Sequence, residues 1–204
     1  MDSSCSEFDR NYGQEQLRKS RHPLRQWVKG FYLENILQDI RGATVDFGCG
    51  AGQLLERLPE GSLGLEVNPF LVKALQNTGL NVQQYNFEKD QFSLGHLHAV
   101  EYQTLVMAHV LEHITDAGFY LRTLLASCRR LGISRVILIL PTKKGFLSDS
   151  THKTFVDSLY LEHEGLLHCQ NYRVTKMSYF PFNILSLGHF FTYHELKVVY
   201  DFEG

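Results

Sequence analysis

Three alternating glycines, Gly48, Gly50 and Gly52, are the residues of this chain best suited to holding a ligand. Glycine tolerates positive φ and has no side chain, so the backbone of such a run can lie directly against a ligand. The glycines follow a short run, residues 44–47, in which Val45 and Phe47 are apolar, and a helical pattern of leucines follows the glycines. A strand, a glycine turn and a helix in this order form the first unit of a nucleotide-binding α/β fold, in which free N–H groups of the helix face the ligand.

A carboxylate follows the glycines at the spacing that ribose recognition requires. Residues 62–67 predict a second strand, and Glu66 stands near its end. A carboxylate about 20 residues beyond the first glycine hydrogen-bonds the ribose hydroxyls in nucleotide-binding folds. An isolated glutamate would more simply be a solvated strand end. Its pairing with the glycine run favours the ribose contact.

The glycine spacing itself separates two kinds of cofactor site. Gln53 stands at the position where the dinucleotide fingerprint G-x-G-x-x-G has its third glycine. Residues 46–52 instead resemble motif I of the class I S-adenosylmethionine (SAM) dependent methyltransferases. The resemblance implies that SAM is the cofactor, that the three glycines Gly48, Gly50 and Gly52 hold its methionyl part, that Glu66 holds the ribose, and that Asp46 supports the loop.

Two further segments extend the resemblance. In that family the residues after the third strand hold the adenine, and Asn86 stands at this place, although an asparagine at a strand end is equally a routine turn residue. Residues 107–113 are similar to the Leu-Glu-His segment of small-molecule methyltransferases of the quinone-biosynthesis type (methyltransferase types 11 and 12). By the same resemblance Ala108, at the end of the fourth strand, belongs to the cofactor-binding residues.

Methyl transfer requires few catalytic residues. It is a direct displacement in which positioning supplies most of the acceleration, and a base is needed only if the acceptor must lose a proton. His109 stands at the carboxyl end of the fourth predicted strand, where open α/β sheets bind ligands, and an ordinary histidine pKa suits a general base. A histidine that only packs is an equally good interpretation. His152, in the polar loop 141–152, is the second candidate, because the resembling group has a histidine in this loop.

A metal motif overlaps the first of these histidines. His109, Glu112 and His113 spell H-x-x-E-H, which on a helix is typical of zinc peptidases. The motif here leaves a strand of a glycine-loop fold, which disfavours a peptidase. Some quinone and small-RNA methyltransferases bind a divalent ion through E-x-x-E-H at this place, but a histidine for the first glutamate disfavours magnesium. The sequence therefore assigns no metal ligand.

The elements that must position these residues alternate along the chain. Strands are predicted at 43–48, 62–67, 81–86, 102–108 and 134–140, and helices at 23–40, 52–58, 69–78, 114–131 and 153–165. This alternation predicts an α/β fold with a parallel sheet and helices on both faces. Two β-prone runs, 172–180 and 191–202, predict a terminal antiparallel pair. The resemblance implies a Rossmann-like sheet of seven strands whose last strand is antiparallel.

Composition sets the limits of this prediction. The chain of 204 residues suits one domain at 22–204 after a polar segment at 1–21. A net charge of −2 with 44% hydrophobic residues favours a packed core and does not favour nucleic-acid binding. The four cysteines are dispersed and the N-terminus lacks signal-peptide order, so we expect a cytoplasmic protein. The apolar run 136–140 is too short to span a bilayer.

The predicted function follows from these residues together. We expect a SAM-dependent methyltransferase acting on an O or N atom of a small-molecule acceptor, as a monomer or homodimer. Six aromatic residues between 179 and 193 could wall an apolar acceptor pocket, although we favour a core role for them. An RNA or protein acceptor, which the basic residues between 18 and 25 would suit, and a non-catalytic SAM-binding partner subunit remain alternatives.

Overall fold

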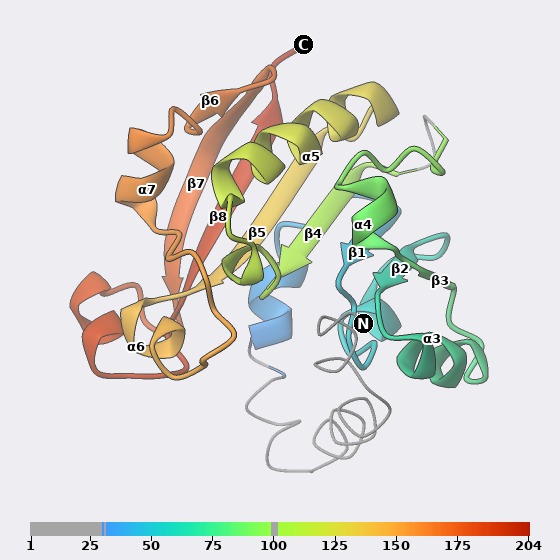
Figure 1. The fold of residues 1–204 in the computed structure, drawn as a ribbon, viewed down its shortest axis with the longest axis horizontal. Coiled ribbons are helices and arrows are strands. Elements are labelled where there is room, and N and C mark those ends of the chain that lie inside the picture. The colour runs from blue at the N-terminus through green and yellow to red at the C-terminus, as the bar shows by residue number, and fades with distance from the viewer. Residues whose placement is uncertain (1–29, 31, 99–101) are drawn as a thin grey trace.

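The computed structural model describes residues 30, 32–98 and 102–204. The predicted polar segment at 1–21, the basic residues at 18–25 and the start of the predicted helix at 23–40 lie outside the described residues. The later part of that helix is present at 32–37. Figure 1 shows one central sheet with helices around it, and its eight strands lie in the order β3-β2-β1-β4-β5-β8-β7-β6.

The first five strands are parallel and confirm the predicted α/β fold. They are β1 (Thr44–Phe47), β2 (Leu63–Glu66), β3 (Val82–Gln84), β4 (Thr104–Ala108) and β5 (Arg135–Pro141). Each lies within two residues of its predicted bounds. Because all five run in the same direction, their carboxyl ends share one edge of the sheet, which is where such sheets bind ligands.

The last strands are antiparallel, as expected. They are β6 (His168–Cys169), β7 (Tyr172–Phe180) and β8 (Glu195–Phe202). The last strand, β8, pairs antiparallel with both β5 and β7. The expected sheet had seven strands, and the eighth is the two-residue β6, which pairs antiparallel with β7 and is too short for a sequence pattern to reveal.

Two predicted helices match the structure because their ends are encoded locally. Helix α3 (Pro69–Gln76) begins at Asn68, whose side chain accepts hydrogen bonds from two N–H groups of the first turn. Helix α5 (Ala117–Leu131) begins at Asp116, whose side chain accepts the N–H of Phe119, and ends at Gly132, which has positive φ.

Two predicted helices are much shorter than expected. Residues 52–58 form only the 3-10 helix η2 (Leu55–Arg57), because Pro59 forces its predecessor Leu58 into an extended conformation. The helix predicted at 153–165 is only α7 (Ser158–His163). Lys153 and Thr154 instead donate their backbone N–H groups to the carbonyl of Glu112, which prevents an earlier helix start.

The remaining elements are single turns. They are α4 (Phe87–Asp90), α6 (Lys143–Phe146), η3 (Leu111–His113) and η4 (Leu185–His189). Helix η3 follows β4 directly, and α6 follows β5, so both turns stand at the carboxyl edge of the sheet. Within the described ranges, no helix is long and apolar enough to cross a membrane.

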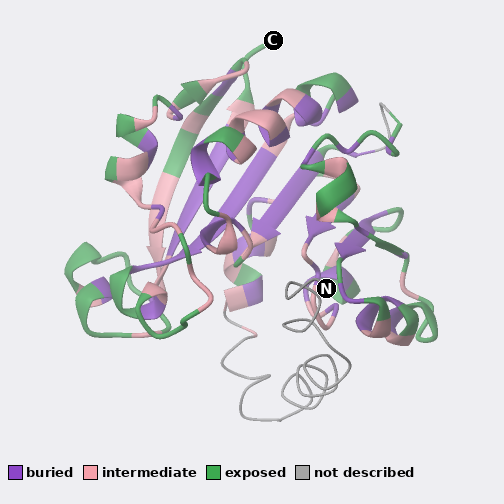
Figure 2. Ribbon diagram, in the orientation of Figure 1, coloured by how far each residue is buried: buried purple, intermediate pink, exposed green. Residues whose placement is uncertain are grey.

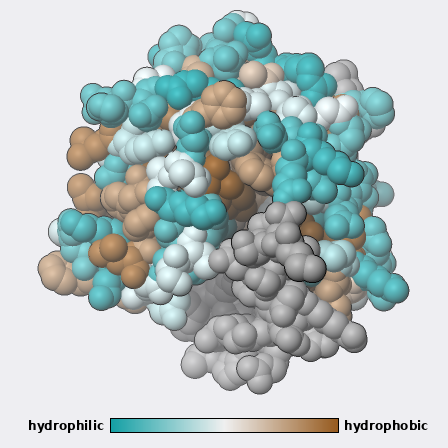
Figure 3. Space-filling model, viewed as in Figure 1, coloured by the Kyte–Doolittle hydropathy of each residue, from teal (hydrophilic) through white to brown (hydrophobic). Residues whose placement is uncertain are grey.

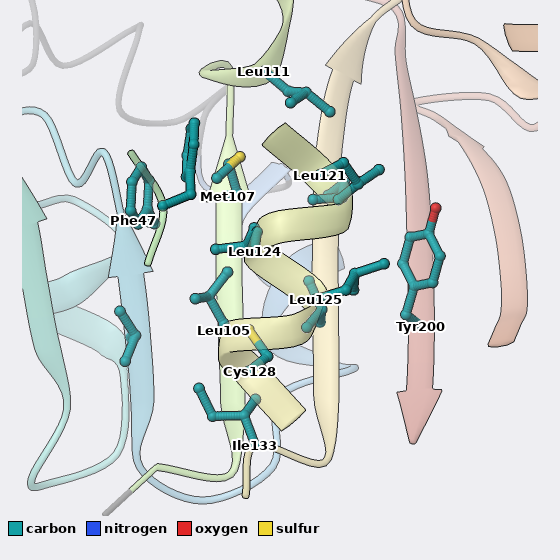
Figure 4. Close-up of a cluster of buried hydrophobic side chains, with 14 of the residues drawn as sticks. Phe47, Leu105, Met107, Leu111, Leu121, Leu124, Leu125, Cys128, Ile133 and Tyr200 are labelled. Atoms are coloured by element: carbon teal, nitrogen blue, oxygen red, sulfur yellow. The ribbon is translucent and has the colours of Figure 1, made fainter. Parts of the chain in front are cut away.

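The core confirms that helices cover both faces of the sheet. Leu105 and Met107 of β4 pack in one cluster with Leu124 of α5, as Figure 4 shows. Val106, which points to the other face because side chains alternate along a strand, packs in a second cluster with Ile36 of the helix at 32–37. The central strands β1, β4 and β5 are buried except at Ala108 and Arg135, and Figure 2 shows them mostly in the colour of buried residues.

The aromatic residues near the C-terminus contradict the favoured core role. Four of the six are exposed: Phe182, Phe190, Phe191 and Tyr193, with relative exposures of 60%, 81%, 41% and 70%. They lie on the segment between β7 and β8, at the lower left in Figures 1, 2 and 3. The segment packs against α6, where the Thr142 hydroxyl contacts the carbonyl oxygens of Gly188 and His194, but this contact leaves the four aromatic side chains exposed.

Candidate functional site

The candidate site lies at the carboxyl edge of the parallel strands. Phe47 at the end of β1 is in register with Leu65 of β2 and Met107 of β4. The residues that follow these three strands therefore meet at one edge. Because β8 is antiparallel, its first residue, Glu195, lies at the same edge, in register with Pro141 at the end of β5.

The glycine loop has the conformation for which only glycine is well suited. Gly48, Gly50 and Gly52 have φ values of 78°, 54° and 76°. A Cβ on Gly48 would lie 2.4 Å from Cγ2 of Val110, and a Cβ on Gly52 would lie 2.9 Å from Cδ2 of Leu75. A Cβ on Gly50 would have no atom of the described residues within 4 Å. Two of the glycines are therefore needed for packing, and Gly50 is the one that no described side chain contacts.

Glu66 at the end of β2 is tied directly to this loop. One carboxylate oxygen accepts the N–H of Gly50 at 2.8 Å, and the other accepts the N–H of Asn68 at 2.8 Å. Burial raises the pKa of Glu66, and these N–H donors offset only part of that effect. The structure therefore brings the glycine loop and the predicted ribose contact together.

The loop does not present the row of free N–H groups that the sequence predicts. Gly48 and Cys49 donate to the carbonyl of Leu65, Gly50 donates to Glu66, and Gly52 donates to the carbonyl of Cys49. No α-helix follows, so a helix dipole does not act here. The loop is instead a rigid surface, which suits close approach of a ligand better than capture of a phosphate.

The other predicted cofactor residues surround this loop. Asp46 is buried in β1. Burial raises the pKa of the neighbouring Cys49 thiol, and the carboxylates of Asp46 and Glu66 raise it further. Asn86 is exposed at the end of β3, where its side chain accepts the N–H of Lys89 and caps α4. Ala108 is half-buried at the end of β4. The cap shows the turn role of Asn86, and its adenine contact stays a prediction.

His109 is held between two carboxylates. Its Nδ1 lies 3.3 Å from Oε1 of Glu112, and its Nε2 lies 3.0 Å from Oε1 of Glu195. Its φ is 56°, an uncommon backbone conformation for a residue other than glycine. Unusual backbone conformations of this kind cluster at functional sites.

The charge state of His109 follows from these neighbours. The side chain of His109 is 40% exposed, so the effect of burial, which by itself lowers the pKa of the ring, is limited. The carboxylates of Glu195 and Glu112 outweigh it and raise the pKa to about 10. Because both ring nitrogens face carboxylate oxygens, the site favours the protonated ring. This geometry favours a structural or orienting role over the general base that the sequence suggests for His109.

His152 reaches the same place from a distant part of the chain. The hydrogen bonds from residues 153 and 154 to the carbonyl of Glu112 hold the loop against η3. As a result Nε2 of His152 lies 3.9 Å from Oε1 of Glu112, and its ring centroid lies 4.7 Å from that of His113. The structure therefore brings both predicted catalytic histidines to the buried carboxylate of Glu112.

Two features of this site could not be predicted from the sequence. Glu195 begins a long β-strand and carries no motif, so only the antiparallel pairing with β5 reveals that it faces His109. The H-x-x-E-H motif forms a single 3-10 turn instead of a helix, so its two histidines do not line one helix face. The peptidase alternative therefore loses the geometry it requires.

Comparison with solved structures identifies the fold. A SAM-dependent methyltransferase from Archaeoglobus fulgidus has a TM-score of 0.68 and 17% identity, over 95% of this chain and 100% of that one. Magnesium protoporphyrin IX methyltransferase from Synechocystis PCC 6803, with bound S-adenosylhomocysteine (SAH), has a TM-score of 0.65 and 12% identity, over 96% of each chain. The N-methyltransferase NodS from Bradyrhizobium japonicum, also with SAH, has a TM-score of 0.62 and 12% identity, over 95% of this chain and 98% of that one.

At these identities the likeness establishes the fold. The chain has the fold of class I SAM-dependent methyltransferases, as the resemblance of residues 46–52 implied. No protein-family model matches the sequence, and no curated protein sequence matches it.

Proposed function

We propose that the protein is a SAM-dependent methyltransferase that transfers a methyl group to an O or N atom of a small-molecule acceptor. One observation carries this proposal: the hydrogen bond of 2.8 Å from Gly50 N–H to the Glu66 carboxylate, which joins the glycine loop to the predicted ribose contact. The fold shared with SAM-dependent methyltransferases supports it.

The cofactor would lie along the carboxyl edge of β1, β2 and β3. No atom of the described part of the chain lies within 4 Å of the position that a Cβ on Gly50 would take, so the methionyl part can approach the backbone there. Each oxygen of Glu66 accepts one of the backbone hydrogen bonds described above, and a carboxylate has about four acceptor positions. The positions left over suit ribose hydroxyls. Asn86 and Ala108 stand at the strand ends that flank this path.

The acceptor would lie on the other side of the glycine loop, near β4 and β8. His109, Glu112 and His152 meet there, and the exposed aromatic segment between β7 and β8 begins and ends beside them. Exposed apolar surface next to a polar cluster suits a small acceptor with an apolar body and one reactive polar atom. Positioning by these groups, more than acid or base chemistry, would accelerate the transfer.

Calorimetry with SAM and with SAH tests the cofactor part of the proposal. Wild-type protein is expected to bind both, and Glu66→Ala is expected to bind about 10- to 100-fold more weakly, because hydrogen bonds to a charged group contribute about 1.5–3 kcal/mol. Glu60→Ala is the matched control, since Glu60 is exposed in the turn before β2. A folded wild-type protein that binds neither compound would refute the proposal.

Methyl transfer itself is tested with labelled SAM and fractionated cell extract. Label in a small, organic-soluble product would support the small-molecule acceptor. Label in RNA or in protein would replace it with one of the alternatives. SAM binding without any labelled product would support a non-catalytic subunit.

A further inference from the structure

An apolar surface is exposed where β5 ends and β8 begins. Two segments form it, residues 142–148 and 181–194, and we call them together the platform. Seven of the eleven large hydrophobic side chains that are exposed in the described part of the chain belong to the platform: Leu147, Phe182, Ile184, Leu185, Phe190, Phe191 and Tyr193. Figure 3 shows hydrophobic side chains in brown at the lower left, where these segments lie. Single exposed apolar residues are ordinary, but a group of this size marks an interaction surface.

Buried contacts hold the two segments of the platform together. The Thr142 hydroxyl donates to the carbonyl of His194 at 2.7 Å. The ring of His194 is completely buried, and its Nε2 lies 3.0 Å from the carbonyl oxygen of Phe182. A Cβ on Gly145 would lie 2.7 Å from the carbonyl oxygen of Thr192, so the two segments pack with no room for a larger residue there. The exposed side chains therefore stand on a fixed base.

The platform contains basic residues and no acidic ones. Lys143 and Lys144 are exposed on α6, and neither segment contains an aspartate or a glutamate. The carboxylates that flank the platform in the sequence are engaged elsewhere. Asp149 accepts two hydrogen bonds from its own loop, and Glu195 lies 3.0 Å from the ring of His109. The platform is therefore both apolar and cationic.

We infer that the platform docks on the surface of an anionic lipid membrane. Exposed aromatic and aliphatic side chains enter the boundary between head groups and acyl chains, and lysines beside them attract anionic head groups. A second copy of the chain fits less well. In a twofold dimer the platform would face itself, and its lysines would meet lysines with no carboxylate of the platform between them.

The place of the platform in the sheet fixes the orientation of the docked molecule. The platform follows β5 and precedes β8, so it lies at the carboxyl edge of the parallel strands, beside the candidate site. Docking therefore turns this edge toward the lipid. Resting on the proposed function, this orientation gives an apolar acceptor a path from the membrane to His109.

Vesicle binding is measured on the full chain without SAM. Co-sedimentation is compared between vesicles of phosphatidylcholine alone and vesicles with an equal amount of phosphatidylserine. Two lysines near an anionic surface strengthen binding about 10- to 30-fold, so we expect this preference for the mixed vesicles and its loss at high salt. Absence of binding to the mixed vesicles would overturn the inference.

Apolar variants locate the docking surface. Phe190→Ser and Leu185→Ser are each expected to weaken binding to the mixed vesicles about 10-fold, since each removes an apolar side chain that the lipid would cover. Phe119→Ser is the matched control, because Phe119 is an exposed phenylalanine on α5, outside the platform. Wild-type binding in both platform variants would overturn the inference, and thermal unfolding shows that each variant is folded.

Charge variants test the electrostatic part. The double variant Lys143→Gln and Lys144→Gln is expected to bind both kinds of vesicle equally, because no lysine remains on the platform. Lys73→Gln, which removes an exposed lysine of α3, is the control and is expected to keep the preference for the mixed vesicles. An unchanged preference in the double variant would contradict an anionic lipid as the occupant.

Two further measurements separate the other outcomes. Sedimentation velocity without lipid detects self-association. A dimer that Phe190→Ser dissociates, together with no vesicle binding, would replace the membrane with a second copy of the chain. SAH calorimetry on the same preparations separates docking from the proposed function. Binding of SAH without binding of vesicles contradicts only the docking surface, and binding of vesicles without SAM or SAH contradicts only the proposed function.

Discussion

The substitution Gly50→Ala separates backbone strain from ligand contact. Gly50 has φ 54° and nothing lies within 4 Å of the position that a Cβ would take, so alanine there collides with no described protein atom. The cost to folding is only that of an L-residue in the left-handed region, about 1–2 kcal/mol. The new methyl group, however, fills the space into which the methionyl part of SAM would approach.

The loss of affinity follows from this geometry. A methyl group pushes a ligand in van der Waals contact away from the loop by roughly 1.5 Å, which breaks one or two hydrogen bonds. At about 1–1.5 kcal/mol for each bond, the dissociation constant for SAH rises about 10- to 100-fold. Calorimetry with SAH measures this change directly.

Gly165→Ala is the matched control. Gly165 has φ 64°, follows α7 and likewise has nothing within 4 Å of the position that a Cβ would take. Both variants should lose the same stability in chemical denaturation, but only Gly50→Ala should lose affinity for SAH. Equal SAH affinity in the two variants would refute the assignment of the glycine loop as the cofactor site.

Three further predictions concern the fold. Asp39→Asn should cost about 3 kcal/mol at neutral pH, because the buried ammonium of Lys197 loses a carboxylate 2.6 Å away. Burial raises the pKa of Asp39, but its partners Lys197 and Lys176 outweigh this effect and hold the pKa below the ordinary 3.8. The carboxylate therefore stabilises the fold above pH 3.8, and this stabilisation is lost as the pH falls through the lower pKa of the folded state. The free energies of unfolding of the wild type and of the variant, measured between about pH 7 and pH 3, should approach each other as the pH falls. Gly48→Ala should destabilise by more than about 2 kcal/mol, since its Cβ would lie 2.4 Å from Val110, and a variant as stable as Gly165→Ala would contradict the loop packing. Phe190→Ser should change stability by less than about 0.5 kcal/mol in thermal unfolding, because Phe190 is 81% exposed, whereas a large loss would show that the aromatic segment is part of the core.

The sequence predicts the sheet well because the signals for its strands are local. Short apolar runs alternate with helical patterns, and the caps Asn68 and Asp116 mark the starts of α3 and α5. The predicted lengths of the helices at 52–58 and 153–165 are wrong because residues outside the apolar pattern of each helix decide where it begins or ends. Pro59 ends the first, and distant hydrogen bonds to the carbonyl of Glu112 delay the second.

The cofactor half of the site is more predictable than the acceptor half. The glycine loop and Glu66 lie on neighbouring elements, so their spacing in the sequence fixes their meeting. Glu195 contacts His109 because the antiparallel strand β8 brings it to this edge of the sheet. His152 lies near Glu112 because hydrogen bonds hold its loop in place. Neither contact can be read from the spacing of residues in the sequence. The raised pKa of His109 depends on its near neighbour Glu112 and on the distant Glu195, so a role as a base inferred from the sequence could not anticipate a pKa of about 10.

A crystal structure of the protein with SAH tests the central claim most directly. The account predicts that the ribose hydroxyls lie within hydrogen-bond distance of the Glu66 carboxylate while the amino-acid part lies against Gly48, Gly50 and Gly52. A nucleoside bound elsewhere, or a ribose that makes no contact with Glu66, would contradict it.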